Sequence, residues 1–180
     1  ENESVLKDFS LKVPKGKTVA LVGQSGSGKS TIANLLTRFY DVQQGNIKID
    51  GIDIKDFNLQ SLRGLMGLVT QDSILFNDTI KNNLLLGKED ASDEEIIEAL
   101  KVANAYEFVK DLPGGIETNI GDSGNKLSGG QKQRLTIARA LVPNPQILIL
   151  DDSASALDFA TDAALRKAIK QNTENMTVLM

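Results

Sequence analysis

A glycine-rich segment near the start of the chain has the residue types and spacing needed to bind phosphate. Residues 23–31 read Gly-Gln-Ser-Gly-Ser-Gly-Lys-Ser-Thr, which contains the Gly-x4-Gly-Lys-Ser spacing of the phosphate-binding loop, or P-loop. Glycines let the backbone approach phosphate oxygens without a Cβ in the way, and backbone N–H groups at a helix start attract anions. Lys29 would reach the β- and γ-phosphates, and the Ser30 hydroxyl would ligand Mg²⁺. The candidate nucleotide-binding residues are Gly23, Gln24, Ser25, Gly26, Ser27, Gly28, Lys29, Ser30 and Thr31.

A carboxylate after a later apolar run would complete a magnesium site. Residues 146–150 are Gln-Ile-Leu-Ile-Leu, typical of a buried parallel strand, and Asp151 and Asp152 follow directly. Ligands bind in open α/β sheets beyond the carboxyl ends of the strands. Paired with the P-loop about 120 residues earlier, this pattern predicts a Walker B strand whose Asp151 holds the metal.

The elements that position these residues alternate between strand and helix. Residues 18–22 read as a buried strand before the P-loop, and residues 31–39 as the helix after it. Residues 65–70 read as a strand that delivers Gln71 at its end. Further elements are expected as strands at 9–13, 45–49 and 177–180, a turn at 50–51, and helices at 59–64, 79–86, 92–103, 105–111, 129–142 and 159–171.

The helices after Gln71 predict an all-helical lobe over residues 73 to about 141, inserted into an α/β core of residues 1–72 and 142–180. Ser92 and Glu95 form a capping-box pattern at the start of one lobe helix. Ser128 is the expected N-cap of another, and Pro143 ends it. The fold class predicted is therefore α/β, a single domain with a P-loop NTPase (RecA-like) core, an N-terminal antiparallel β part and an inserted helical lobe.

Composition excludes several classes of function. The 180 residues carry a net charge of −4, which disfavours a general nucleic-acid surface. The chain contains no Cys and no His, which excludes disulfides, thiolate or His-ligated zinc sites and a Ser-His-Asp triad within these residues. No apolar run reaches 18 residues, so membrane association is expected through a partner or through other segments.

The stretch from 127 to 141 closely resembles the signature motif of the ATP-binding cassette (ABC) family. It reads Leu-Ser-Gly-Gly-Gln-Lys-Gln-Arg-Leu-Thr-Ile-Ala-Arg-Ala-Leu and lies just before the Walker B strand. Physically it is a second phosphate-binding helix start, with a hydroxyl, two glycines and a helix dipole. The resemblance implies that Leu127, Ser128, Gly129, Gly130 and Gln131 bind the ATP of a partner subunit.

The resemblance extends over essentially the whole chain. It implies that Gln71 is the Q-loop glutamine, which contacts Mg²⁺ and the attacking water and senses the transmembrane partner. It also implies that Ser155, Ala156, Leu157 and Asp158 form the D-loop. Asp111 to Gly124 and Gln71 to Asn83 look like exporter sequences. By the same resemblance, an adenine-stacking aromatic and a switch histidine lie outside the fragment, which is expected to be truncated at both ends.

What the family resemblance implies is an exporter ATPase domain that binds ATP and Mg²⁺ and dimerises head to tail with a second nucleotide-binding domain. A transmembrane domain of the same polypeptide is the other expected partner, nucleic acid is not expected, and the location is the cytoplasmic face of the cell membrane. The metal ligands implied are Ser30, Gln71 and Asp151, and the catalytic residues are Asp152, Gln71 and Lys29.

The chain departs from the family pattern at Asp152, where a glutamate normally acts as general base. A carboxylate pulled back by more than about 1 Å loses base geometry, which can cost about 100-fold in rate. Two interpretations remain open: a tolerated conservative change, or the slow, degenerate site of a heterodimeric exporter, with a heterodimer favoured. Two alternative functions also stay open, namely a soluble ABC-family ATPase and a catalytically weak, nucleotide-gated module.

Overall fold

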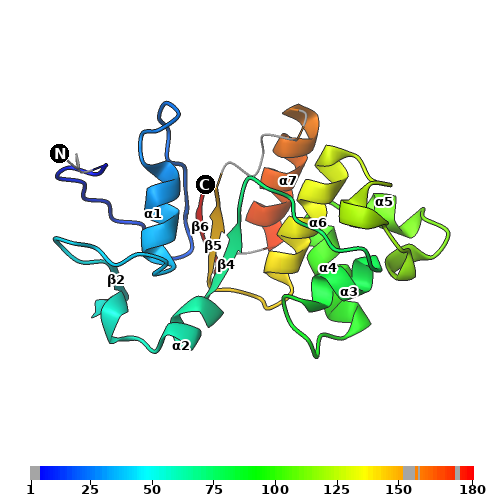
Figure 1. Cartoon of the computed structure of the whole chain (residues 1–180), viewed down its shortest axis with the longest axis horizontal. Helices are drawn as coiled ribbons and strands as arrows, with labels where there is room; N and C mark the ends of the chain where they lie inside the picture. The colour runs from blue at the N-terminus through cyan, green and yellow to red at the C-terminus, as the bar shows by residue number, and fades with distance from the viewer. Residues whose placement is uncertain (1–4, 152–156, 158, 173–174) are drawn as a thin grey trace.

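A computed structural model describes residues 5–151, 157, 159–172 and 175–180 (Figure 1). Within them, four parallel strands form the main sheet in the order β1-β6-β5-β4. These strands are β1 (Thr18–Val19), β4 (Met66–Val69), β5 (Ile147–Leu150) and β6 (Thr177–Leu179). The apolar residues of β5 and β6 are buried on both faces, as expected for inner strands of a parallel sheet. The sheet therefore has β5 and β6 at its centre.

Helices cover both faces of this sheet (Figure 1). The helix α1 (Lys29–Leu36) lies on one side, and α6 (Gly129–Leu141) and α7 (Phe159–Asn172) lie on the other. Leu135, Ile137 and Ala138 of α6 are completely buried in a core that includes Leu148 of β5 and Val178 of β6. The carboxyl ends of the strands meet at one edge of the sheet, where the predicted chemistry lies.

Short helices between β4 and α6 form the helical side of the molecule. They are α3 (Ile80–Leu85), α4 (Asp93–Val102) and α5 (Tyr106–Lys110), followed by the 3-10 turns η2 (Gly115–Glu117) and η3 (Asp122–Gly124). Ser92 and Glu95 form the expected capping box on α4, and Thr79 caps α3. Two hydrogen bonds lower the pKa of Glu95: that from Lys88 has the larger effect, and that from the Ser92 N–H the smaller one.

No helix in the described part of the chain has the length and apolar character needed to cross a membrane.

A small antiparallel hairpin stands beside the main sheet. It pairs β2 (Lys48–Ile49) with β3 (Ile52–Asp53). Asp50 and Gly51 connect the strands with φ of 48° and 85°, the positive values that a tight type I′ turn requires. The 3-10 turn η1 (Ile54–Asp56) and α2 (Leu59–Gly64) lead on to β4. The turn at 50–51 and the helix at 59–64 are thus confirmed as predicted.

One strand prediction near the amino terminus is wrong, and a second is correct only in part. Residues 9–13 form no strand, because no described segment pairs with them, and Phe9 is 50% and Leu11 44% exposed. The predicted buried strand at 18–22 is reduced to the two residues of β1, with a further hydrogen bond from Leu21 N–H to the Met180 carbonyl. β1 is the edge strand next to β6, and Val22 is 95% exposed. Apolar alternation alone does not make a strand without a partner ladder.

Candidate functional site

The P-loop connects β1 to α1 with glycines in backbone conformations that other residues rarely adopt. Gly26 and Gly28 have φ of 82° and 95°, and Gly28 is the N-cap of α1. The predicted helix at 31–39 begins two residues earlier, at Lys29, and ends at Leu36. The loop therefore opens directly onto the positive end of the α1 dipole.

Lys29 folds back over the loop that precedes it. Its Nζ donates hydrogen bonds to the carbonyl oxygens of Gly23 (2.9 Å) and Gln24 (3.0 Å), with the Ser27 hydroxyl 3.4 Å away. A cation held against the loop by these oxygens lies where it could attract the negative oxygens of a phosphate. The sequence prediction that Lys29 serves the phosphates is compatible with this position.

Ser30 and Asp151 meet across the edge of the sheet, although 121 residues separate them. The Ser30 hydroxyl donates to Asp151 Oδ1 over 2.9 Å. Asp151 lies just beyond β5, where its N–H donates to the Val69 carbonyl of β4 over 2.8 Å. The tertiary structure thus joins the P-loop serine to the carboxylate predicted from the Walker B pattern.

Gln71 lies at the same edge, two residues beyond the end of β4, and its side chain is exposed. The register pairs Val69 with Leu150, so Gln71 and Asp151 follow neighbouring strands. Lys29 and Asp151 also line a cavity of about 160 Å³ between α1 and α7. The three sequence-predicted positions Lys29, Ser30 and Asp151 are therefore gathered in one place, and Gln71 follows the adjacent strand.

The side chains at this edge fit Mg²⁺. A hydroxyl and a carboxylate oxygen are hard ligands, and Mg²⁺ is usually bound by one or two carboxylates together with substrate phosphates and waters. In the described ranges, no group of three or more acidic side chains could hold a metal by itself. Ser30 and Asp151 would therefore hold the ion together with the phosphates.

The signature residues lie elsewhere. Ser128 caps α6, accepting from the Gln131 N–H (3.2 Å), while Gln131 Oε1 accepts from the Ser128 N–H (2.9 Å). Figure 1 shows α6 across the sheet from α1. Arg134 holds this helix start in place, since its Nη1 donates to the Asn104 carbonyl over 2.7 Å and its guanidinium lies 4.8 Å from the Phe108 ring centre. The structure does not bring the signature residues to the P-loop of the same chain.

Several predicted site residues lie outside the described residues. They are the candidate base Asp152 and the D-loop residues Ser155, Ala156 and Asp158. Leu157 is described and packs against the apolar core.

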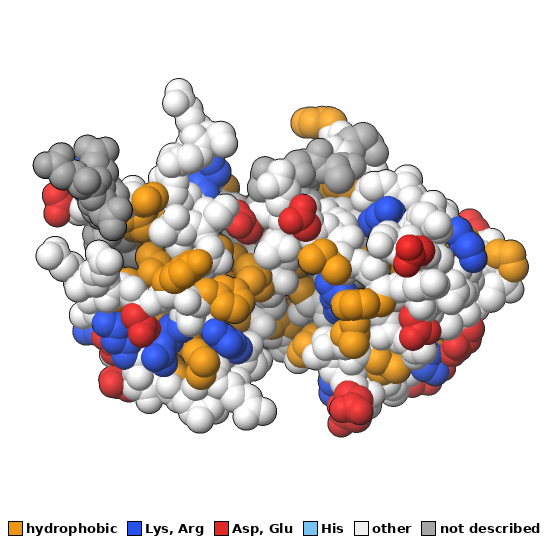
Figure 2. Space-filling view, viewed as in Figure 1, with side chains coloured by type: hydrophobic (Ala, Val, Ile, Leu, Met, Phe, Trp, Pro, Cys, Tyr) orange, Lys and Arg blue, Asp and Glu red, His pale blue; other side chains and the backbone are white. Residues whose placement is uncertain are grey.

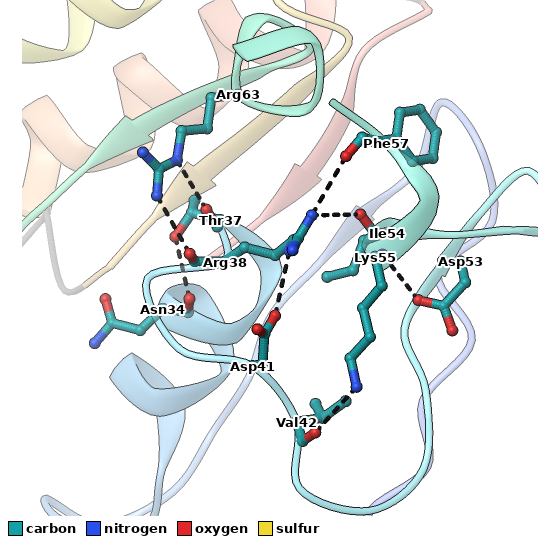
Figure 3. Close-up of polar contacts among 10 residues, drawn as sticks. All are labelled: Asn34, Thr37, Arg38, Asp41, Val42, Asp53, Ile54, Lys55, Phe57 and Arg63. Carbon is teal, nitrogen blue, oxygen red and sulfur yellow. Dashed lines mark hydrogen bonds and ion pairs between the residues drawn. The ribbon is translucent and has the colours of Figure 1, made fainter. Parts of the chain in front are cut away.

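Two arginines that the sequence reasoning missed anchor the carboxyl end of α1 (Figure 3). Arg63 of α2 donates to the carbonyl oxygens of Thr37 (3.1 Å) and Arg38 (3.2 Å) and stacks 4.8 Å from the Phe39 ring centre. Arg38, in a left-handed conformation with φ of 51°, donates to the carbonyls of Ile54 and Phe57. Positive charge at the end of a helix complements its dipole. No spacing pattern in the sequence marks these residues, because the contacts join separate elements.

Replacing Arg63 with alanine is expected to lower the free energy of unfolding by about 1–2 kcal/mol, because two charged hydrogen bonds and a ring contact are lost at an exposed site. Urea denaturation monitored by circular dichroism measures the change. Lys167→Ala, which removes an exposed cation from α7, is the control and is expected to stay within about 0.5 kcal/mol. Equal stabilities of the two variants would contradict the anchoring role of Arg63.

Comparison with known proteins agrees with the fold and the nucleotide site described above. The fold is that of a P-loop NTPase nucleotide-binding domain. Residues 6–155 match the family model described as ABC transporter, and the chain belongs to the ABC transporter family.

Similar proteins are much longer than this chain. Two relatives from Staphylococcus aureus, strains NCTC 8325 and COL, are named as multidrug export ATP-binding/permease proteins and are 54% identical to it over 181 residues. The alignments cover 100% of this chain and 31% of each relative. A solved bacterial Atm1-family ABC exporter with ATP bound is similar with a TM-score of 0.84 and 48% identity, over 91% of this chain and 29% of that one. The chain thus spans about a third of the length of these relatives.

Proposed function

We propose that this domain binds and hydrolyses MgATP to drive export by a membrane transporter. The contact between Ser30 and Asp151 carries the proposal, because it places a hydroxyl and a carboxylate beside the loop that would hold the phosphates. The names of the similar proteins support export as the process that hydrolysis drives. A soluble ABC-family ATPase is less favoured, since these relatives are exporters and permeases.

Each residue at the strand edge has a proposed part in the reaction. Backbone N–H groups of the P-loop and Lys29 Nζ would hold the β- and γ-phosphates and neutralise charge that builds on the oxygens. Ser30 and Asp151 would hold Mg²⁺, whose charge stabilises the transferring phosphoryl group. Gln71, which follows the neighbouring strand, would orient the attacking water. Asp152, next to Asp151 in the sequence, would accept the proton of that water.

A complete site is proposed to need a second nucleotide-binding domain. Leu127, Ser128, Gly129, Gly130 and Gln131 begin α6 with two glycines and a capped helix start, which suits an anion. The P-loop of the same chain lies across the sheet from α6. The signature would therefore close over ATP held by the partner, and the domain would work at the cytoplasmic face of the membrane beside its transmembrane domain.

The aspartate at position 152 leads to a more specific proposal. Its side chain is one methylene shorter than the glutamate of the family pattern, so a water activated there would lie farther from the carboxylate. The signature at 127–131 is intact. We propose that this domain is the slow half of a heterodimeric exporter, which retains ATP while its signature serves the faster site of the partner.

ATP hydrolysis by the purified full transporter tests both levels of this proposal. Asp152→Glu is expected to raise turnover at this site about 10- to 100-fold, because the longer side chain restores base geometry. Turnover at saturating MgATP is compared with the wild type in homodimers of the full subunit, which lack the faster site of a different partner. The binding of a fluorescent ATP analogue is measured on the same samples.

The outcomes separate the general proposal from the specific one. Wild-type homodimers that hydrolyse ATP as fast as Asp152→Glu homodimers contradict the slow-site proposal and leave the ATPase proposal intact. Failure of both proteins to bind the analogue contradicts the ATPase proposal itself. Asp90→Glu adds one methylene to another carboxylate, at an exposed position before α4, and serves as the matched control that is expected to leave turnover unchanged.

A further inference from the structure

The segment that follows Gln71, residues 72–76, is hydrogen-bonded to α6, the helix that carries the signature motif. Ser73 donates its hydroxyl hydrogen to Oε1 of Gln133, a residue of α6. One residue further, the Ile74 carbonyl accepts from Nη1 of Arg139, also on α6, over 3.0 Å. Two consecutive residues of the segment are thus tied to one helix from another part of the chain.

Gln133 is an unusual residue for its position. It is 0% exposed, and in the described part of the molecule its Nε2 has no hydrogen-bond partner. A buried amide that loses its remaining contact is strongly disfavoured, because water cannot replace the lost bond. The contact with Ser73 is therefore expected to persist when either element moves. Burial also lowers the pKa of the Arg139 guanidinium, in agreement with its enclosed position.

The far end of the segment is fixed to a different helix. The Asn83 side chain, 1% exposed, accepts from the Phe76 N–H over 2.8 Å and donates to the Phe76 carbonyl over 3.1 Å. Asn83 belongs to α3, which does not carry the signature. The part of the segment nearest Gln71 is therefore hydrogen-bonded to α6, and the part farther away is hydrogen-bonded to α3.

The helix α6 can transmit a displacement without bending. It runs over 13 residues with the capping box of Ser128 and Gln131 at its start. Gln133 lies five residues beyond Ser128, or about 7.5 Å along the helix axis. A shift of the segment at Ser73 would thus move the amino-terminal end of α6 as part of a rigid body.

We infer that Gln133, assisted by Arg139, is a positioning residue that couples the Q-loop of this chain to its signature motif. The inference rests on the proposed function, in which Gln71 serves the ATP of this chain and the signature serves that of the partner. The contact between Ser73 and Gln133, supported by that between Ile74 and Arg139, would make each nucleotide site respond to the other.

Substitution of Gln133 by methionine tests the coupling in the full transporter. Methionine has a similar shape and removes the unpartnered donor, so the thermal midpoint is expected to stay at or above that of the wild type. We expect kcat for MgATP to fall about 10-fold and KM to change less than about twofold, because the signature is misplaced while the P-loop is intact. Gln171→Met, the same change at an exposed position on α7, is the control.

A double-mutant cycle with Ser73→Ala identifies the bond itself. Ser73→Ala is expected to lower kcat to a similar extent, and the double variant is expected to be no slower than either single variant. If Gln133→Met does not fold, Ser73→Ala alone decides, since it removes one oxygen from a partly exposed residue. The inference is overturned if the kcat of Gln133→Met or of Ser73→Ala stays within twofold of the wild type. It is also overturned if the fold-losses in kcat of the two single variants multiply in the double variant. A wild-type transporter without MgATP binding contradicts the proposed function instead.

Discussion

Replacing Lys29 with alanine is expected to reduce ATP hydrolysis at this nucleotide site about 100- to 1000-fold, measured in homodimers of the full subunit. Lys29 Nζ lies 2.9 Å from the Gly23 carbonyl and 3.0 Å from the Gln24 carbonyl, against the start of the P-loop. Alanine removes the single charge that the loop offers to the phosphates, so both ATP affinity and transition-state stabilisation fall. Turnover at saturating MgATP and the dissociation constant of a fluorescent ATP analogue measure the two effects separately.

Stability must be measured beside activity, because Lys29 also joins backbone groups of the loop. The loss of these exposed hydrogen bonds is expected to shift the thermal midpoint by only a few degrees. Lys29→Arg is a second variant, which keeps the charge but changes its shape, and it should lose most of the activity because a guanidinium is not interchangeable with an ammonium group. Turnover of Lys29→Ala within twofold of the wild type would refute the role of this residue.

Asp151→Asn is expected to lower turnover at this nucleotide site about 100-fold or more, measured in homodimers of the full subunit, with partial recovery at high Mg²⁺ concentration. Ser30 donates its hydroxyl hydrogen to Asp151 Oδ1 over 2.9 Å, and an asparagine Oδ1 can still accept this bond. The fold should therefore persist while the negative charge that attracts the metal is lost. Turnover measured over a range of Mg²⁺ concentrations shows whether the defect lies in metal affinity.

Asp162→Asn provides a matched control, because Asp162 lines the same cavity from α7 and accepts from Arg166 Nε over 2.7 Å. The change removes a carboxylate of the same kind without touching Ser30. Its Mg²⁺ dependence is expected to match the wild type. Similar Mg²⁺ dependence of Asp151→Asn and Asp162→Asn would argue against a metal-binding role for Asp151.

The charged side chains are distributed differently over the two sides of the molecule (Figure 2). In Figure 2, several Lys and Arg side chains gather on the side that carries β2 and α2, where Figure 3 shows Arg38 and Arg63 at the end of α1. Acidic side chains are spread over the helical side, which includes the first turn of α4 with Asp93, Glu94 and Glu95. Carboxylates in a first turn are stabilised by the helix dipole, so these charges have a local structural reason.

Local chemistry explains which elements were predicted correctly. Ser92 with Glu95 and Ser128 with Gln131 start helices by satisfying backbone N–H groups within four residues, so their sequence signals are sufficient. Asp50 and Gly51 form a turn because both accept positive φ. The prediction of a strand at 9–13 was wrong because strand formation depends on a partner that lies elsewhere in the chain. The strand predicted at 18–22 was correct only for Thr18 and Val19, which pair with β6.

The sequence by itself determined the chemistry of the proposed site: a glycine loop with Lys29 and Ser30, a carboxylate at Asp151, and the capped start of the signature helix. These signals are readable because each depends on residue type within a few positions. Only the tertiary structure decided that Ser30 contacts Asp151, that Arg63 anchors α1, and that Gln133 reaches Ser73. Each of these contacts joins segments far apart in the chain, and their geometry depends on how the sheet and helices pack, which residue spacing does not encode.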